Sequence, residues 1–126
     1  CAAYAGCTQY TFIHSPPNHE SDPTGRRHND PGAKLDAGKT RVWLVLGGFA
    51  RALEAVSQVG TDGAVKYSDN GWLEVPDGIA RYSDAMGRHL LKEAKGEKVD
   101  PSGSLHAAHV AWNALARLEL MLRDSA

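Results

Sequence analysis

The sequence predicts an all-α protein, a small helical bundle. Apolar residues between positions 41 and 126 recur at spacings of three and four, which is the period of one helix face. Within residues 41–126, the only run that also fits a short strand is Val42–Leu46. The chain has 126 residues, of which 42% are hydrophobic and 23% charged, as is typical of one folded domain.

Residues 1–40 are predicted to form an irregular arm, and residues 41–126 a helical domain. The arm is rich in proline and glycine, and its one apolar cluster, Tyr10–Ile13, is expected to form at most a short strand or turn. Such a segment buries too little apolar surface to fold alone. It would be ordered only by packing on the core or on another subunit.

The first helix is expected to run from Trp43 or Leu46 to Gly60. Gly47–Gly48 weaken its start, since each glycine costs about 1 kcal/mol against alanine in a helix. Gly60 and Gly63 are predicted to end or kink it, with a helical turn over Asp62–Tyr67 to follow. Its apolar face consists of Leu46, Phe49, Ala50, Leu53 and Val56.

Two longer helices are expected, from Pro76–Asp77 to Gly96 and from Ser104 to Arg123. The short Glu97–Gly103 connection predicts that they lie antiparallel. The buried face of the first consists of Ile79, Tyr82, Met86, Leu90 and Leu91. That of the second consists of Leu105, Ala108, Ala111, Trp112, Leu115, Leu118 and Leu122.

Three helices of this size form a marginal core by surface-to-volume scaling. Their wide apolar faces are covered more easily when chains pair. We therefore expect a homo-oligomer, a dimer or a tetramer.

Charge and cysteine content exclude several classes of protein. Lys plus Arg number 14 against 15 Asp plus Glu, a formal charge of −1, so no direct nucleic-acid binding is expected. No apolar run approaches the roughly 20 residues of a membrane span, so no membrane partner and a cytoplasmic location are expected. Cys1 and Cys7 form neither a disulfide framework nor a paired CxxC motif.

Histidines on the last predicted helix are the most informative polar residues. His106, His109 and Asn113 are spaced i, i+3 and i+7, which places them on one stripe of an otherwise apolar helix. Buried polar groups without partners cost about 1–3 kcal/mol each. The stripe therefore indicates either a site or a set of satisfied structural histidines at a packed interface.

The preceding helix offers a second stripe. His89 and Glu93, at i and i+4, can share one metal ion or form a simple exposed ion pair. Glu97 and Asp100 follow and offer the hard oxygen ligands that Mg²⁺ prefers, although loop carboxylates are commonly just solvated. Glu54, at the border of the first helix face, can reach a site shared between helices.

Basic residues form a further pattern. Arg81, Arg88 and Lys92 lie on one side of the second long helix, and lysines surround Gly38 in the stretch 34–41. A glycine loop with lysines can hold phosphate, whereas the plain alternative is a solvated basic surface. Carboxylates and imidazoles beside these cations suit a metal-bound polyphosphate.

The chain resembles a family of small phage-encoded proteins known as dATP/dGTP diphosphohydrolases, loosely related to MazG-like all-α nucleotide pyrophosphohydrolases. The order and spacing of the matching segments agree over about residues 32 to 124. The segments are Gly32–Arg41, Gly63–Tyr67, Asn70, Trp72, Arg81–Tyr82, Arg88–Leu91, Gly96–Gly103 and His106–Asn113.

The resemblance implies a metal-dependent enzyme that converts deoxynucleoside triphosphates, dATP or dGTP among them, to the monophosphate and pyrophosphate. The ExxE and ExxD pairs of MazG-like enzymes are absent, so a differently assembled site for Mg²⁺ or Mn²⁺ is expected. Its ligands are drawn from Glu54, His89, Glu93, Asp100, His106 and His109. Glu54 or Glu93 would act as the catalytic carboxylate that orients or deprotonates a water.

The expected substrate-binding residues carry positive charge, aromatic rings or an amide. They are Lys34, Lys39, Lys66, Tyr67, Arg81, Tyr82, Arg88 and Asn113. Tyr82, Trp72 or Trp112 would stack on the base. The alternative is a non-enzymatic phage assembly or interaction protein on the same helical fold, and a weaker one is a zinc-binding module.

Overall fold

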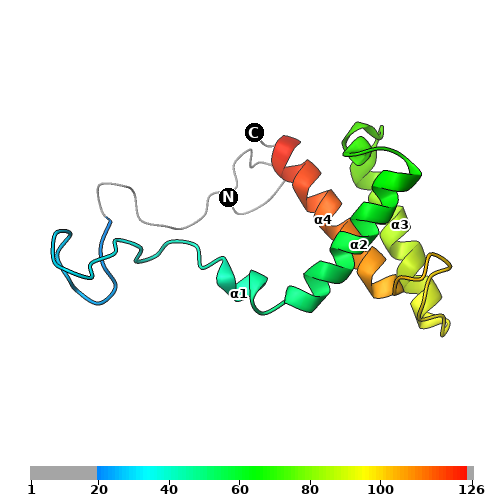
Figure 1. Cartoon of the computed structure of the whole chain (residues 1–126). Coiled ribbons are helices and arrows are strands. Elements are labelled where there is room, and N and C mark those ends of the chain that lie inside the picture. The colour runs from blue at the N-terminus through cyan, green and yellow to red at the C-terminus, as the bar shows by residue number, and fades with distance from the viewer. Residues whose placement is uncertain (1–19, 125–126) are drawn as a thin grey trace.

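The computed structural model describes residues 20–124 and is helical, which confirms the all-α prediction. Within that part of the chain, the only β interaction is one isolated bridge between Val99 and Leu105. The α-helices and one 3-10 helix are α1 (Trp43–Leu46), α2 (Ala50–Lys66), η2 (Gly71–Glu74), α3 (Gly78–Ala94) and α4 (His106–Asp124). Figure 1 shows α2, α3 and α4 packed together, with α1 and the segment before it extending away from them.

Residues 20–41 contain turns and no helix or strand. The carboxylate of Asp22 organises these turns, because its Oδ1 accepts a hydrogen bond from the Thr24 backbone N–H at 2.6 Å and its Oδ2 one from the Lys34 N–H at 2.7 Å. The Thr24 hydroxyl also donates to Asp22. The predicted strand or turn at Tyr10–Ile13 lies outside the described residues.

The first predicted helix is divided differently from the prediction. The run Val42–Leu46, which also fits a strand, contains the short helix α1 (Trp43–Leu46) with Val42 as its N-cap, and the break falls at Gly47–Phe49. The prediction that Gly60 and Gly63 end the helix is wrong, because α2 continues to Lys66. Gly60 allows a close approach: a Cβ there would lie 3.3 Å from Nε1 of Trp112 on α4.

Helices α3 and α4 form an antiparallel pair, as predicted from their short connection. Gly78, at the start of α3, packs on Leu120 near the end of α4, where a Cβ on the glycine would lie 2.8 Å from Leu120 Cδ1. Further along α3, Ser83 Oγ accepts a hydrogen bond from Arg117 Nε. The order of these contacts runs in opposite directions along the two helices. The C-terminal end of α3 therefore lies beside the N-terminal end of α4.

The core is small. The buried apolar residues of the described chain are Val56, Val59, Ala108 and Ala116. Several residues of the predicted buried faces are instead exposed, because no element of the described chain covers them: Leu46, Phe49, Leu90, Leu91, Leu105, Leu115 and Leu118. No helix of the described residues is long and apolar enough to cross a membrane.

Candidate metal centre

The segment that joins α3 to α4 is shaped by a glycine. Gly96 has a φ of +100°, the left-handed conformation that favours glycine at a helix C-terminus. Its N–H donates to the Glu93 carbonyl and the Glu97 N–H to the Lys92 carbonyl, both at 3.0 Å. These two bonds form a Schellman motif, which ends α3 and places Glu97 just beyond it.

A tight turn then carries Asp100. The Gly103 N–H donates to the Asp100 carbonyl at 2.8 Å, and the Asp100 N–H donates to the Ser104 carbonyl at 2.8 Å. Gly103 has a φ of +95°, which a residue with a side chain rarely adopts. The His106 N–H donates to the Lys98 carbonyl at 3.0 Å and closes the loop. The start of α4 is thereby held against the loop that carries Asp100.

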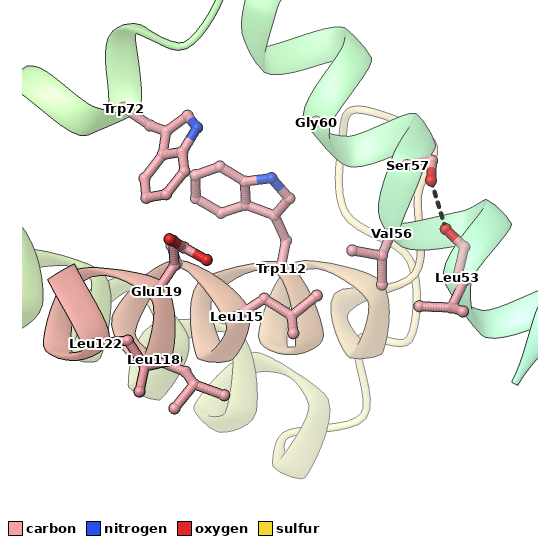
Figure 2. Close-up of a pocket in the computed structure, with 11 residues that line it drawn as sticks. Leu53, Val56, Ser57, Gly60, Trp72, Trp112, Leu115, Leu118, Glu119 and Leu122 are labelled. Atoms are coloured by element: carbon pink, nitrogen blue, oxygen red, sulfur yellow. Dashed lines mark hydrogen bonds between the residues drawn. The ribbon is translucent and has the colours of Figure 1, made fainter. Parts of the chain in front are cut away.

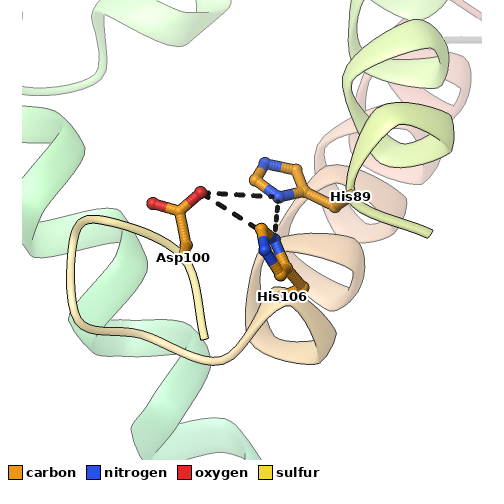
Figure 3. A group of neighbouring side chains, drawn as sticks. All are labelled: His89, Asp100 and His106. Atoms are coloured by element: carbon orange, nitrogen blue, oxygen red, sulfur yellow. Dashed lines mark hydrogen bonds and ion pairs between the residues drawn. The ribbon is translucent and has the colours of Figure 1, made fainter. Parts of the chain in front are cut away.

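Two histidines, one from each long helix, meet at this loop. His89 lies on α3 and His106 is the first residue of α4, and their Nδ1 atoms are 2.8 Å apart. Figure 3 shows both rings turned toward the Asp100 carboxylate. Oδ1 of Asp100 lies 3.9 Å from Nδ1 of His89 and 3.8 Å from Nδ1 of His106. The three donor atoms converge within 4.8 Å of one another.

Glu97 fixes the orientation of His106. The His106 residue is 0% exposed, and its Nε2 lies 2.6 Å from Oε2 of Glu97. A carboxylate only accepts hydrogen bonds, so Nε2 carries the proton. In the neutral ring Nδ1 then has a free lone pair, which accepts from Nδ1–H of His89. A histidine that donates one N–H to a carboxylate and offers the other nitrogen to an ion is the usual arrangement in metal sites.

His109 extends the cluster. Its ring stacks on that of His89, with centroids 4.4 Å apart and planes 9° from parallel. Its Nε2 lies 3.1 Å from Ser102 Oγ and 3.7 Å from Oδ2 of Asp100. His109 therefore supplies a third imidazole beside the same carboxylate.

The electrostatics keep the imidazole of His89 neutral and the carboxylate of Asp100 ionised. Burial, reinforced by the neighbouring His109, lowers the pKa of His89 below its usual value, against the attraction of Asp100. Burial acts to raise the pKa of Asp100, but the Ser102 N–H and hydroxyl, with His109 and His89, outweigh it and lower that pKa. Neutral imidazole and ionised carboxylate are the forms that bind metal ions.

The donor set fits a divalent metal ion. Two imidazoles and one carboxylate, with a third imidazole adjacent, suit Mn²⁺, Fe²⁺ or Zn²⁺ better than the all-oxygen shell that Mg²⁺ prefers. Two nitrogen ligands that bind one ion at about 2.1 Å lie about 3 Å apart at a ligand angle of about 90° and about 3.4 Å apart in a tetrahedral site, and the smaller separation is close to the 2.8 Å between the two Nδ1 atoms. An ion there would take the place of the proton that His89 shares with His106.

Of the predicted ligands, the structure brings together His89, Asp100, His106 and His109. Glu54 and Glu93 are exposed, and neither contributes a donor atom to the converging set. Glu93 lies one helical turn after His89, on a part of the α3 surface that faces solvent. Asn113 is buried, but its Nδ2 donates to the His109 carbonyl at 2.8 Å, within α4.

The predicted substrate-binding residues divide among three regions. Lys34 and Lys39 belong to the extended segment, where Lys39 pairs with Glu20 at 3.0 Å. At the other end of α3 from the cluster, Tyr82 donates its hydroxyl to the Trp72 carbonyl at 2.7 Å, and Arg81 Nη1 lies 3.3 Å from the Pro76 carbonyl. Lys66 lies over the ring of the exposed Tyr67, 5.2 Å from its centroid. Arg88 is exposed and directly precedes His89 in α3, and Asn113 is bonded to the His109 carbonyl.

An aromatic group occupies the space between η2, α3 and α4. Tyr82 and Trp112 make an edge-to-face contact with ring centroids 5.5 Å apart, and Trp72 contacts Trp112 at 5.9 Å. Trp72 and Trp112 also line an apolar groove between α2 and α4 (Figure 2). The tryptophans are thus part of the packing that joins α2 to α4.

Two supporting residues take roles that the sequence analysis did not predict. Glu97 was expected to offer a ligand oxygen, yet its carboxylate hydrogen-bonds to His106. Ser102 was expected to cap the last helix at most, yet its N–H donates to Oδ2 of Asp100 at 2.9 Å. Aspartate followed two residues later by serine, in a stretch with proline and glycine, is a known signature of a side-chain-capped turn. That signature could have identified Ser102.

Comparison with known proteins adds one family match. The model of the family described as dATP/dGTP diphosphohydrolase, N-terminal, matches residues 29–126, which include the whole cluster. No curated protein and no solved structure matches the chain. The family description names a hydrolase that acts on deoxynucleotides, and the match is to the N-terminal part of such proteins. The chain belongs to the dATP/dGTP diphosphohydrolase N-terminal family.

Proposed function

We propose that this chain is a metal-dependent nucleoside triphosphate pyrophosphohydrolase that acts on deoxynucleotides such as dATP and dGTP. It would cleave the bond between the α- and β-phosphates and release the monophosphate and pyrophosphate. One observation carries the proposal: Glu97 holds buried His106 so that its unprotonated Nδ1 faces His89 and Asp100. The family match supports the deoxynucleotide substrate.

His89, Asp100 and His106 are the residues that would hold the ion, Mn²⁺ or Mg²⁺, with His109 beside them. A bound divalent ion neutralises phosphate charge and lowers the pKa of a bound water. Glu97 keeps His106 in the tautomer that can act as a ligand. Ser102 keeps Asp100 ionised and turned toward the histidines.

Arginines on α3 would contact the phosphates. Arg88 is exposed next to His89, and Arg81 is exposed two helical turns earlier, about 10 Å along the helix axis. Seven residues apart, they share a face of α3. A triphosphate lying along this face would have one end at the cluster and the other near Arg81. Positive charge at these positions stabilises the charge that develops as the phosphoanhydride breaks.

The water would be oriented by a carboxylate near the cluster. Glu93, one turn from His89 and open to solvent, remains the candidate for this role. Glu54 on α2 is the second candidate. Asn113, bonded to the backbone of its own helix, would instead support the start of α4.

The test is a pyrophosphate-release assay over the common dNTPs and NTPs, with Mg²⁺ and with Mn²⁺. Asp100→Asn keeps the size of the side chain but removes the ligand charge, and is expected to lower turnover at least about 100-fold. Asp62→Asn, an exposed acid on α2 outside the cluster and away from the arginine face of α3, is the control and should keep wild-type turnover. Circular dichroism of both variants checks that the helices are intact. Equal turnover of Asp100→Asn and wild type would overturn the assignment of the site.

A second candidate function is a non-enzymatic interaction protein on the same fold. The exposed apolar residues of α1 favour it, since large apolar patches mark interaction surfaces. If the wild-type chain releases pyrophosphate from no nucleotide with either metal, this second function replaces the first.

A further inference from the structure

Helix α1 and its surroundings form an exposed apolar segment. Six residues in succession or nearly so are 47% to 76% exposed: Val42, Trp43, Leu44, Val45, Leu46 and Phe49. Monomers rarely show more than a few hundred Å² of contiguous apolar surface. A segment of this kind is expected to have a partner that covers it.

The segment is held away from the bundle of its own chain. The Gly47 N–H donates to the Trp43 carbonyl at 2.8 Å, the Phe49 N–H to the Val45 carbonyl at 2.9 Å, and the Leu53 N–H to the Phe49 carbonyl at 2.8 Å. These bonds bridge the Gly47–Phe49 break, so α1 projects from the N-terminal end of α2, outside the packed helices (Figure 1).

The same chain also has an apolar groove, which lies between α2 and α4. Leu115, Leu118 and Leu122 of α4 line the groove together with Leu53 and Val56 of α2, and Figure 2 labels all five. Its volume is about 450 Å³. Leu115 and Leu118 are 49% and 44% exposed, so this part of α4 lacks a neighbour.

We propose that α1 of one chain docks into the α2–α4 groove of a second copy, and that α1 of the second copy docks into the groove of the first. Every chain then supplies one apolar helix and one apolar groove, and a two-fold symmetric pair uses both. Because α2 crosses α4, part of α4 has no neighbouring helix. Helix α1 of the second copy would pack against that part of α4. The proposal does not depend on the enzymatic function.

Charge and area support a second copy as the occupant. Arg41 and Arg51 flank the uncharged apolar segment 42–49, whereas the only charged residue that lines the groove is Glu119. An aromatic residue buries roughly 150–250 Å², so Trp43 and Phe49, counted in both reciprocal contacts, contribute at most about 600–1,000 Å². The aliphatic residues and the groove walls bring the total into the range of about 1,200–2,000 Å² of a stable interface.

The test measures self-association by sedimentation velocity over roughly 1–100 μM, a range chosen to span typical dimer affinities. Trp43→Glu removes the apolar helix and Leu118→Glu blocks the groove, and each should weaken dimerisation at least about tenfold. Val65→Glu is the control, because Val65 is 84% exposed on α2 and outside both surfaces. It should dimerise like the wild type. Circular dichroism confirms that each variant keeps its helices.

Mixing the two variants distinguishes this mode of pairing from any other. The Trp43→Glu chain still has an intact groove, and the Leu118→Glu chain still has an apolar α1. A mixed dimer therefore regains one of the two contacts between α1 and a groove. The mixture should dimerise measurably more strongly than either variant alone. A monomeric wild type at 100 μM, as when α1 folds into its own groove, would overturn the proposal. The proposal would also be overturned if Trp43→Glu and Leu118→Glu dimerised as strongly as the wild type, or if the Val65→Glu control dissociated as they do. A mixture that dimerised no more strongly than either variant alone would overturn it as well.

Discussion

Glu93 and Glu97 lie four residues apart near the end of α3, and substitutions at the two positions distinguish support of a metal ligand from action on the water. Glu97 bonds to buried His106, whereas Glu93 faces solvent. Glu97→Gln keeps an acceptor but loses the charge that fixes the His106 tautomer. We expect it to lower metal affinity about 10–100-fold, as measured by calorimetric titration with Mn²⁺. Glu93→Gln should leave that affinity unchanged, and if it still lowers turnover, Glu93 acts on the water. Loss of Mn²⁺ binding in Glu93→Gln would contradict this division.

The imidazoles of the cluster predict which ion binds best. Nitrogen ligands favour Mn²⁺ over Mg²⁺, which prefers oxygen and releases water reluctantly. We expect half-maximal binding at a Mn²⁺ concentration at least about tenfold lower than for Mg²⁺, measured by thermal shift and calorimetry. Asp100→Asn should lose most of the stabilisation by Mn²⁺. Tight Zn²⁺ binding with no hydrolysis under any metal would instead favour a zinc-binding module.

Asp22 makes the turns of residues 20–37 sensitive to acid. Hydrogen bonds from the Thr24 hydroxyl and the Lys34 N–H lower its pKa from 3.8 to about 2. A lowered carboxyl pKa contributes stability above the unfolded value near 4 that is lost as the pH falls through 2. Protection of the Lys34 amide from hydrogen exchange should therefore decrease between pH 4 and pH 2. Asp22→Asn should show low protection throughout, and a protection that is constant with pH in the wild type would contradict this assignment.

At the scale of elements, the glycines of α2 explain why one helix boundary was mispredicted. Glycine usually weakens a helix, yet α2 passes through both Gly60 and Gly63, because Gly60 lets Trp112 approach and α4 packs there. A Cβ on Gly63 would meet nothing within 4 Å. Gly63→Ala should therefore stabilise the protein by about 0.5–1 kcal/mol. Gly60→Ala should gain less or lose stability, because Trp112 must move. Urea denaturation of both variants measures the difference, and an equal gain would show that the Trp112 contact is unimportant.

The helices α3 and α4 were predictable because apolar spacing and a short connection are local signals. The pairing of His89 with His106 also followed from the sequence, since each stripe occupies one helix face and the short loop brings the faces together. The role of Glu97 did not follow, because it depends on the Schellman motif at Gly96, a three-dimensional detail. The exposure of Glu93 likewise depends on how far α3 rotates against α4, and no spacing in the sequence determines that rotation.

At the scale of the whole molecule, the described residues have a small core and a large exposed apolar surface, and a reciprocal dimer would link the stability of the fold to protein concentration. Unfolding of a dimer releases two chains, so a tenfold rise in concentration stabilises it by about 1.4 kcal/mol, or about 0.7 kcal/mol per chain. For a domain of this size that corresponds to a rise in Tm of about 3–5 °C. Calorimetry of the wild type at 10 and 100 μM should show this rise, and Trp43→Glu should show none. A concentration-independent Tm of the wild type would mean that the folded chain is stable alone and that α1 contributes nothing to its stability.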